Sequence, residues 1–494
     1  MLKAQPAQLG LPRVRLALQG MGLMLLAFLL IPLAGRGRGF LLEVVGILAI
    51  LGAIWILKQP YWGVLTLITL AIVDIDPIGI RYLSFPYLTS AILAIPLMLR
   101  CLHDREIWVW RVPQIQILLA IGLLFLISTA WSNFKYEFVI VDPERDTTVR
   151  QLIIFFSRLG FLVFFLYFVN TKQRIEFTTW WVIGLIIIIT LDALHFFVTT
   201  GMIRRSQASF SLAENSNRLA FISIFATSLL WFYRAYSQSP RLKALSLPLL
   251  FYFPLSALSA GSRSGFLQLG LLAAFIVKEQ VHWGIAKQIR ILFLLGAVSV
   301  SAFFFIPDHI LARLTSMDPA TAEQGKDSLY NRVNTDLVAL TMGLDNPFLG
   351  VGIGNFVWAK QNFYGLGRGS NPHNSYLWAL TGGGIGVLIL YLLLFLVTYR
   401  MLRQLERAGP PDLLWLSKAL KVNLFLFLLF SFFADMWLND FLYFIVGITI
   451  CMTNFWQRQR RYLQRSDSPP QRQRQPLPQP SSSPLEINPQ APLH

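Results

Sequence analysis

The stretch NPHNSYLWALTGGGIGVLILYLLLFLVTY, residues 371–399, decides the kind of fold that this chain adopts. From residue 375 onward it is apolar for long enough to cross a bilayer core as one helix, which takes about 20 residues. Comparable apolar runs recur along most of the 494 residues, of which 55% are hydrophobic and only 14% charged. Lipid offers the backbone no hydrogen-bond partner, and the runs are too uniformly apolar for the alternating strands of a barrel. The sequence therefore indicates an all-α polytopic membrane protein.

The number of spans follows from the lengths of these runs. About 12 to 14 transmembrane helices are predicted, because a run that can cross the hydrocarbon core counts as one span. The runs lie at residues 15–34, 39–57, 61–80, 84–100, 113–131, 151–170, 177–199, 216–233, 244–260, 264–278, 291–306, 375–399, 415–434 and 438–455. Two of the shorter runs are also compatible with re-entrant or fused segments.

The positions of Lys and Arg predict the orientation, because cytoplasmic loops retain positive residues. With the N-terminus inside, the predicted cytoplasmic segments hold 26 of the 42 Lys and Arg residues. Both termini are then cytoplasmic, and the long polar loop between the eleventh and twelfth spans, residues 307–372, lies outside. The net charge of +17 follows mostly from this bias, with some attraction to anionic membrane lipids, so it implies no nucleic acid partner.

The organisation that follows is one membrane domain carrying one external loop domain. A short basic cytoplasmic N-terminus, residues 1–14, precedes the first part of the membrane domain, residues 15–306. The external loop, residues 307–372, leads into the last three spans, residues 373–456. Residues 457–494 are rich in Gln, Pro, Ser and Arg, so we expect a disordered cytoplasmic tail.

Arginines on the predicted external face are candidate ligands for a phosphorylated substrate. Arg263 lies in a tight turn between two spans, where its charge either lines a cavity or extends to lipid phosphates. Arg332 opens an amphipathic segment predicted to be helical over residues 331–341. The pair Arg204 and Arg205 precedes another predicted span. Arginine suits a diphosphate, because its planar fork binds phosphate oxygens in pairs and stays charged.

A glycine-rich stretch follows the amphipathic segment. Residues 345–356 read DNPFLGVGIGNF, a turn-rich sequence with glycine at every second position from Gly350 to Gly354. Glycines at this spacing allow the backbone to approach a ligand or a neighbouring helix closely. The pattern is no dinucleotide fingerprint, because no strand or βαβ unit surrounds it.

His373 is the candidate base at the entrance to the quoted stretch. Asn374 and Ser375 can cap the span that follows, and Tyr376 can lie in the interfacial aromatic belt. These neighbours leave the imidazole without an obvious structural task. Histidine ordinarily titrates at about pH 6.5, so it can accept a proton at neutral pH. The two cysteines, Cys101 and Cys451, fall at predicted cytoplasmic span ends, so neither a disulfide nor a thiolate metal site is expected.

The order of these motifs resembles the O-antigen ligase family of bacterial envelopes. The superfamily also contains O-antigen polymerases and bacterial O-oligosaccharyltransferases, and the resemblance covers roughly residues 200–455. The motifs that carry it are Asn217, Ser262-Arg263-Ser264-Gly265, Arg332, Pro347-Phe348-Leu349-Gly350-Val351-Gly352-Ile353-Gly354-Asn355-Phe356, His373-Asn374-Ser375-Tyr376-Leu377 and Thr381-Gly382-Gly383-Gly384-Ile385-Gly386.

The resemblance implies a metal-independent, inverting glycosyltransferase with a GT-C type membrane fold and no cofactor. It implies a bacterial inner membrane protein whose active site faces the periplasm. The donor would be a glycan on undecaprenyl diphosphate, and the acceptor a lipid A core or another glycan. Arg263 and Arg332 would clamp the diphosphate, and His373 would position or deprotonate the acceptor hydroxyl.

Further residues are expected to contact the diphosphate or the glycan. All of them are arginine, asparagine or glycine, and the arginines would widen the cationic rim of the site. They are Arg204, Arg205, Asn217, Arg218, Gly352, Gly354 and Asn374.

Other functions remain open from the sequence. A ligase and a polymerase of this superfamily share donor and leaving group and differ in the acceptor. A transporter would instead use ionisable residues inside spans. The candidates for that role are Glu43, Asp74, Asp76, Arg158, Asp192 and His195, of which Arg158 and Asp192 could simply pair between helices. A scaffold membrane protein would account for the hydrophobicity alone.

Overall fold

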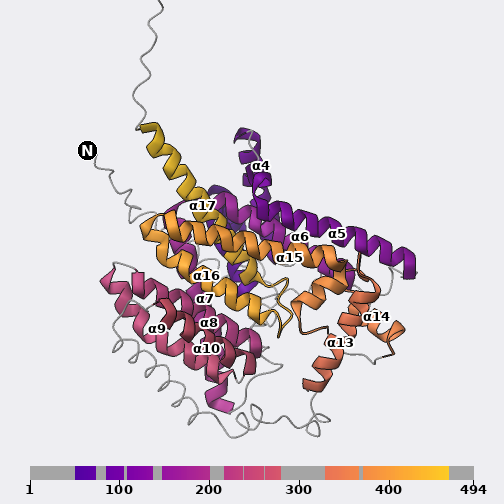
Figure 1. Ribbon diagram of the computed structural model, residues 1–494. Helices are drawn as coiled ribbons and strands as arrows, with labels where there is room; N and C mark the ends of the chain where they lie inside the picture. Colours follow the sequence, from indigo (N-terminus) through magenta and orange to yellow (C-terminus); the bar gives the residue numbers. More distant parts are fainter. Residues whose placement is uncertain are drawn as a thin grey trace, which may run out of the picture.

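The computed structural model of this chain describes residues 50–73, 85–104, 108–136, 147–200, 216–236, 239–260, 262–279, 329–365 and 371–466. Every regular element in these ranges is a helix (Figure 1). The all-α expectation is therefore confirmed for the described part of the chain. The predicted spans 15–34 and 291–306, the N-terminus and the tail from residue 467 lie outside the described residues.

Most helices begin within a few residues of a predicted span. Their bounds are α3 Pro60–Val73, α4 Phe85–Asp104, α5 Pro113–Tyr136, α6 Thr147–Phe168, α7 Lys172–Thr200, α8 Ser216–Tyr236, α9 Pro240–Ser259, α10 Arg263–Glu279, α13 Leu329–Asp345, α14 Phe356–Phe363, α15 Ser375–Ala408, α16 Leu414–Phe430 and α17 Asp440–Ser466. Helices α15 and α17 continue past the predicted ends at residues 399 and 455. Residues 457–466, expected to belong to the disordered tail, form the end of α17. Short 3-10 helices, η1 Trp108–Arg111 and η5 Pro411–Leu413, precede α5 and α16.

Seven stretches in the described helices are long and apolar enough to cross a membrane. They are Pro113–Lys135, Thr148–Phe168, Lys172–His195, Ser216–Tyr236, Leu242–Ser259, Ser375–Ala408 and Pro411–Phe430. Two shorter apolar helical stretches, Pro60–Val73 and Leu88–Leu102, accompany them. This set fits a polytopic membrane protein, and the full count of 12 to 14 spans stays a prediction.

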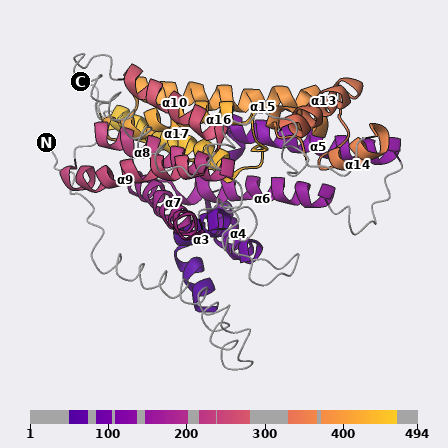
Figure 2. The ribbon, with the colours of Figure 1, turned by 90° about the horizontal axis from the view of Figure 1, so that it is seen from below.

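Helix α15 is the longest described helix and lies along α5 and α16 (Figures 1 and 2). Aromatic side chains fill the space between these helices and α17. The indole of Trp378 on α15 stacks on that of Trp437, with 4.6 Å between ring centroids, and the ring of Phe125 on α5 lies 5.0 Å from Trp437. Large aromatic contacts of this kind stabilise a helix bundle by packing, which fixes where the two ends of α15 lie.

Helix α15 is interrupted at Gly384, whose φ of 76° and ψ of −172° are not helical. The apolar span predicted over residues 375–399 lies within this helix, and the interruption is a feature that the sequence did not predict. The interruption persists because the backbone of residues 347–351 inserts beside it. The amide of Ile385 donates to the carbonyl of Pro347 at 2.7 Å, in place of a bond within the helix.

Helices α13 and α14 lie together at the end of the bundle where α15 begins (Figure 2). Helix α13 covers the amphipathic helix predicted over residues 331–341. Its buried face includes Thr335, Ala339 and Met342, and the last two share a small core with α14. The opposite face exposes apolar side chains at helical spacing, namely Val333, Leu337, Leu340 and Leu344.

Candidate active site

The first turn of α15 is held by Asn374. Its side-chain carbonyl accepts hydrogen bonds from the amides of Tyr376 at 2.9 Å and Leu377 at 3.2 Å. Asn374 itself is extended, with φ −139° and ψ 116°, as an N-cap residue is. The predicted cap is therefore confirmed for Asn374. It sets the direction in which the chain leaves His373.

Ser375 has another role than the cap expected for it. Its amide donates to the carbonyl of Ser431 at 2.8 Å, and its hydroxyl donates to the carbonyl of Ala434 at 2.9 Å. The same hydroxyl accepts from the amide of Met436 at 2.8 Å. Ser375 thus ties the start of α15 to the loop between α16 and α17. One buried serine therefore satisfies two backbone carbonyls and one amide of that loop.

Asp336 connects α13 to His373. The backbone amide of His373 donates a hydrogen bond to the Asp336 carboxylate, and Arg332 lies one helical turn before Asp336. Burial raises the pKa of Asp336, while the hydrogen bond and the Arg332 charge lower it. Two predicted site residues, Arg332 and His373, are therefore brought together through a carboxylate that the sequence alone did not single out.

Polar atoms in this corner are buried without a partner. Within the described residues, Arg332 Nε and Asp336 Oδ1 have no hydrogen-bond partner although neither atom is accessible. A buried polar atom without a partner costs roughly 1–3 kcal/mol, so folding alone does not favour this arrangement. Such atoms are typical of a site that a polar ligand completes.

The starts of α8 and α10 form a second corner. The side-chain carbonyl of Asn217 accepts from the hydroxyls of Ser262 at 2.6 Å and Ser264 at 3.3 Å. A side chain at Gly265 would lie 2.6 Å from Cβ of Ala220, so glycine is what allows the two helices this close. Arg263 is the first residue of α10, and its side chain lies outside the described residues, as do Arg204 and Arg205.

Asp435 lies between the two corners. It is flanked by Ala434 and Met436, which bind Ser375, and its carboxylate accepts from the backbone amide of Trp437. Burial raises the pKa of Asp435 to about 6, although the opposite charge of Arg218 on α8 lowers it. Asp435 thus faces Arg218, a predicted substrate-binding residue, from the loop that holds the start of α15.

The contacts form a continuous path across one end of the bundle. Ser262 meets Asn217, Arg218 faces Asp435, and the loop that carries Asp435 binds Ser375, next to His373 and its partner Asp336. Five described residues of the predicted set, namely Asn217, Arg218, Arg332, His373 and Asn374, therefore lie along this path, while Gly352 and Gly354 lie in the loop after α13. Both glycines adopt positive φ, and Gly352 lies beside Ser132 and Asn355.

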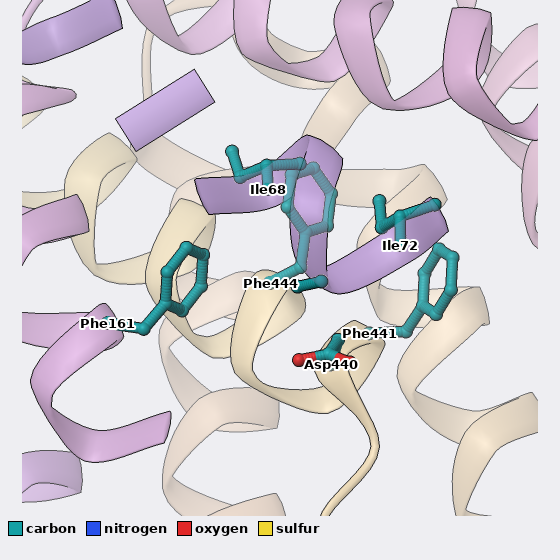
Figure 3. Close-up of a pocket in the computed structure, with 7 residues that line it drawn as sticks. Ile68, Ile72, Phe161, Asp440, Phe441 and Phe444 are labelled. Atoms are coloured by element: carbon teal, nitrogen blue, oxygen red, sulfur yellow. The ribbon is translucent and has the colours of Figure 1, made fainter. Parts of the chain in front are cut away.

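A different hollow lies between α3, α6 and α17 (Figure 3). Its lining is apolar apart from one carboxylate and consists of Ile68, Ala71, Ile72, Phe161, Asp440, Phe441 and Phe444. Asp440 at its edge forms an ion pair with Arg158 at 2.8 Å. Arg158 therefore pairs with Asp440 rather than with Asp192. The transport candidates Glu43, Asp74 and Asp76 lie outside the described residues.

Residues 246–392 match the family model described as O-antigen ligase. This stretch, about 30% of the chain, is therefore similar to the O-antigen ligase family. No curated protein matches the chain. The match confirms the resemblance drawn from the motifs and, together with the apolar helices, supports a multi-pass membrane enzyme of O-antigen and polysaccharide biosynthesis.

The O-antigen ligase match contains Arg263, Arg332 and His373, the three residues proposed for catalysis. Asn217 and Asp435, which complete the path of contacts, lie outside it. One sequence feature indicates Asp435, because it is an acidic residue between two apolar runs. The predicted site residues lay instead around the long polar loop and the other external turns. Asp336 had no signal, because its partner His373 is distant in sequence.

Proposed function

We propose that this chain is a GT-C type glycosyltransferase that transfers a glycan from undecaprenyl diphosphate to an acceptor hydroxyl at the outer leaflet. The observation that carries the proposal is the Arg332–Asp336–His373 cluster, in which a cation and an imidazole-bearing turn share one carboxylate. The O-antigen ligase match over the same residues supports it. The site faces the periplasm of the bacterial inner membrane.

The reaction is a direct displacement with inversion. The acceptor oxygen attacks the anomeric carbon, the bond from that carbon to the diphosphate oxygen breaks, and the diphosphate leaves with the electron pair. His373 takes the proton of the acceptor hydroxyl. Arg263 and Arg332 neutralise the charge that develops on the diphosphate, a role in which fixed donors lower the barrier by roughly 3–4 kcal/mol each. This mechanism assigns no step to a metal ion.

The remaining residues of the path hold this geometry. Arg218 extends the cationic region next to Asp435, and Asn217 sets the start of α8 against the turn that contains Arg263. Asn374 directs the chain at His373 through its capping bonds. Gly352 is buried beside Asn355 and Ser132, so the partly exposed Gly354 is the loop glycine proposed to approach the glycan.

Single substitutions in cells that lack the native gene copy test the proposal. His373→Ala, Arg263→Ala and Arg332→Ala are each expected to abolish glycan transfer while the protein reaches the membrane in normal amount. The matched control is Arg400→Ala, an exposed arginine at the other end of α15, which is expected to retain transfer. Transfer that persists in all three variants contradicts the assignment, and loss of solute uptake on neutralising Asp192 favours a transporter.

The acceptor is the lipid A core or another terminal carrier in a ligase, and a second lipid-linked unit in a polymerase. We propose ligation, with polymerisation as the alternative within the same site. The glycan profile of a deletion strain separates the two. Loss of all attached polymer indicates ligation, whereas a single attached repeat indicates failed polymerisation.

A further inference from the structure

At its interruption, α15 contacts the loop 346–355, and we call this contact the joint. At this joint, the amide of Val351 donates to the carbonyl of Thr381 at 2.7 Å, and the amide of Ile385 donates to the carbonyl of Pro347 at 2.7 Å. The loop 346–355 therefore supplies hydrogen bonds that the helix gives up around Gly384. Because unpaired backbone groups are costly in a membrane protein, the loop and the broken helix stabilise each other.

Glycine is required on both sides of the joint. Gly350 and Gly384 have φ of 65° and 76°, a region in which a side chain is strained. A Cβ on Gly350 would overlap the carbonyl of Thr381, and a Cβ on Gly384 would overlap the carbonyl of Phe348. The backbones are in direct contact, so a small displacement of the loop displaces the helix.

Helix α5 supplies a third component. The fully buried hydroxyl of Ser128 lies within hydrogen-bonding reach of two carbonyls, that of Gly382 at 3.0 Å and that of Leu349. One carbonyl belongs to α15 and the other to the loop, so a single hydroxyl bridges both. Near the end of the same helix, Lys135 Nζ donates to the side chain of Asn346 at 3.0 Å.

The joint is connected to both proposed catalytic elements. The loop continues directly from α13, which carries Arg332, and the interrupted helix continues back to His373 at its start. Asp336 already links α13 to the backbone of His373 at one point. The joint at Ser128 is a second point, and two separate attachments fix the orientation of α13 where one would allow it to pivot.

We propose that Ser128 is a positioning residue, which holds Arg332 and His373 at their working separation by bridging the loop and the break in α15. The proposal rests on the proposed function of those two residues. It gives α5, which lies outside the O-antigen ligase match, a part in the reaction. A displacement of about 1 Å at reacting groups can lower a rate by roughly a hundredfold, so the bridge can matter without touching substrate.

The test compares purified, reconstituted Ser128→Ala and Ser128→Thr with Ser132→Ala. Ser132 is the matched control, because it is one turn along α5, fully buried, and its hydroxyl has no hydrogen-bond partner among the described residues. Ser128→Ala is expected to lower kcat by about tenfold or more with little change in KM. Ser128→Thr keeps a hydroxyl and is expected to recover part of kcat, and Ser132→Ala is expected to match the wild type.

A distance measurement tests the joint independently of activity. Spin labels at Thr341 of α13 and Phe432 of the α16–α17 loop, both exposed, report the separation in a background lacking Cys101 and Cys451. Ser128→Ala is expected to broaden the distance distribution, and Ser132→Ala to leave it unchanged. If Ser128→Ala does not fold, Lys135→Ala replaces it, because this substitution removes the exposed hydrogen bond from Lys135 to Asn346 of the same loop. This variant is expected to broaden the distance distribution less than a loss of the Ser128 bridge would.

The outcomes separate the joint from the proposed function. Equal kcat and equal distance distributions in Ser128→Ala and Ser132→Ala overturn the positioning role. A fall in activity that only follows the amount of folded protein overturns it as well. If His373→Ala retains full transfer, the proposed function fails, while the distance distributions still decide whether Ser128 holds α13.

Discussion

The two ends of α15 carry charges in opposite arrangements. At its last turns, Lys418 and Lys421 of α16 meet Glu279 of α10 and Glu406 of α15, with Lys421 at 2.6 Å from Glu406 and Lys418 at 3.4 Å from it. Two cations and two anions thus satisfy one another. At its first turn, Arg332 and Asp336 retain buried polar atoms without partners among the described residues.

This difference separates a structural cluster from a site. A closed set of opposite charges leaves no charge without a partner, so it needs no ligand. The open set at the start of α15 leaves one donor and one acceptor without a hydrogen-bond partner among the described residues, and both lie within the O-antigen ligase match. Substitutions at the closed end should change stability, and substitutions at the open end should change the reaction.

The largest effect is expected for Arg332. Arg332→Ala should lower kcat by roughly 10²- to 10³-fold, because one fixed donor to the leaving diphosphate is lost. Arg332→Lys should recover only part of the rate, since an ammonium group cannot bind two phosphate oxygens in a plane. Steady-state kinetics and thermal unfolding of the detergent-purified protein measure both consequences. A large loss of stability with unchanged kcat would show that the open end is structural after all.

At the closed end we expect the reverse for Lys418→Met. Removing one cation leaves Glu279 with Lys421 alone at 3.8 Å and should destabilise the fold by about 2 kcal/mol. This is below the cost of breaking a fully buried pair, because the side chains of the network keep 14–21% exposure. The activity per folded molecule should not change.

The control for Lys418→Met is Lys172→Met. Lys172 pairs with Asp412 at 2.5 Å, but both side chains are more exposed, at 34% and 68%. Exposed pairs contribute about 0–1 kcal/mol, so this variant should unfold nearly as the wild type does. Equal destabilisation by the two substitutions would mean that the network adds nothing beyond its separate pairs.

At these two ends, the sequence predicts the features that depend on contacts between neighbouring residues and misses those that depend on contacts between distant residues. The cap at Asn374 and the helix α13 were predictable, because capping and amphipathic periodicity are local patterns. The break at Gly384 and the role of Ser128 were not, because they depend on carbonyls that lie far away along the chain. Ser128 looked like one more small polar residue within an apolar span.

The same limit applies to charged residues. Arg158 and Asp192 were plausible partners by their depth in neighbouring spans, yet Arg158 pairs with Asp440, which begins α17. The sequence gives the depth of a charge but not which helix packs against it. Arg263, Arg332 and His373 were found because they stand in motifs, while Asp336 and Asp435 became visible only through their contacts.

A smaller effect, with a pH dependence, is expected at Asp435. Its pKa is raised to about 6, so the carboxyl is neutral below that pH and faces Arg218 as an anion above it. If the anion holds Arg218 in place, wild-type kcat falls as the pH drops through about 6. Asp435→Asn should then be about tenfold slower than the wild type at pH 8, which corresponds to roughly 1.4 kcal/mol, and its pH profile should keep only the part contributed by protonation of His373, the proposed base.

The stability of the fold gives a second measure of the Asp435 carboxyl, and it changes with pH in the direction opposite to kcat. The folded protein binds this proton more tightly than the unfolded chain, whose carboxyl has an ordinary pKa of 3.8, so stability falls as the pH rises from about 4 to about 6. Asp435→Asn removes that loss and should unfold at a higher temperature than the wild type at pH 8. A variant that is both slower and more stable would assign the carboxylate to function. If Asp435→Asn follows the wild-type pH profile, another group controls the inflection.

The smallest effect is expected at Asn374, which is a proposed substrate-binding residue and also the cap of α15. Its side-chain carbonyl is occupied by two backbone amides, so Asn374→Ala should cost about 1 kcal/mol of stability, as the loss of a cap does. Asn374→Asp keeps an acceptor for those amides and should restore stability. If the side-chain NH₂ of Asn374 also binds the glycan, Asn374→Asp will still have a raised KM. Recovery of both stability and KM would show that Asn374 only caps α15. The proposed substrate-binding residues at this end of the helix would then begin with His373.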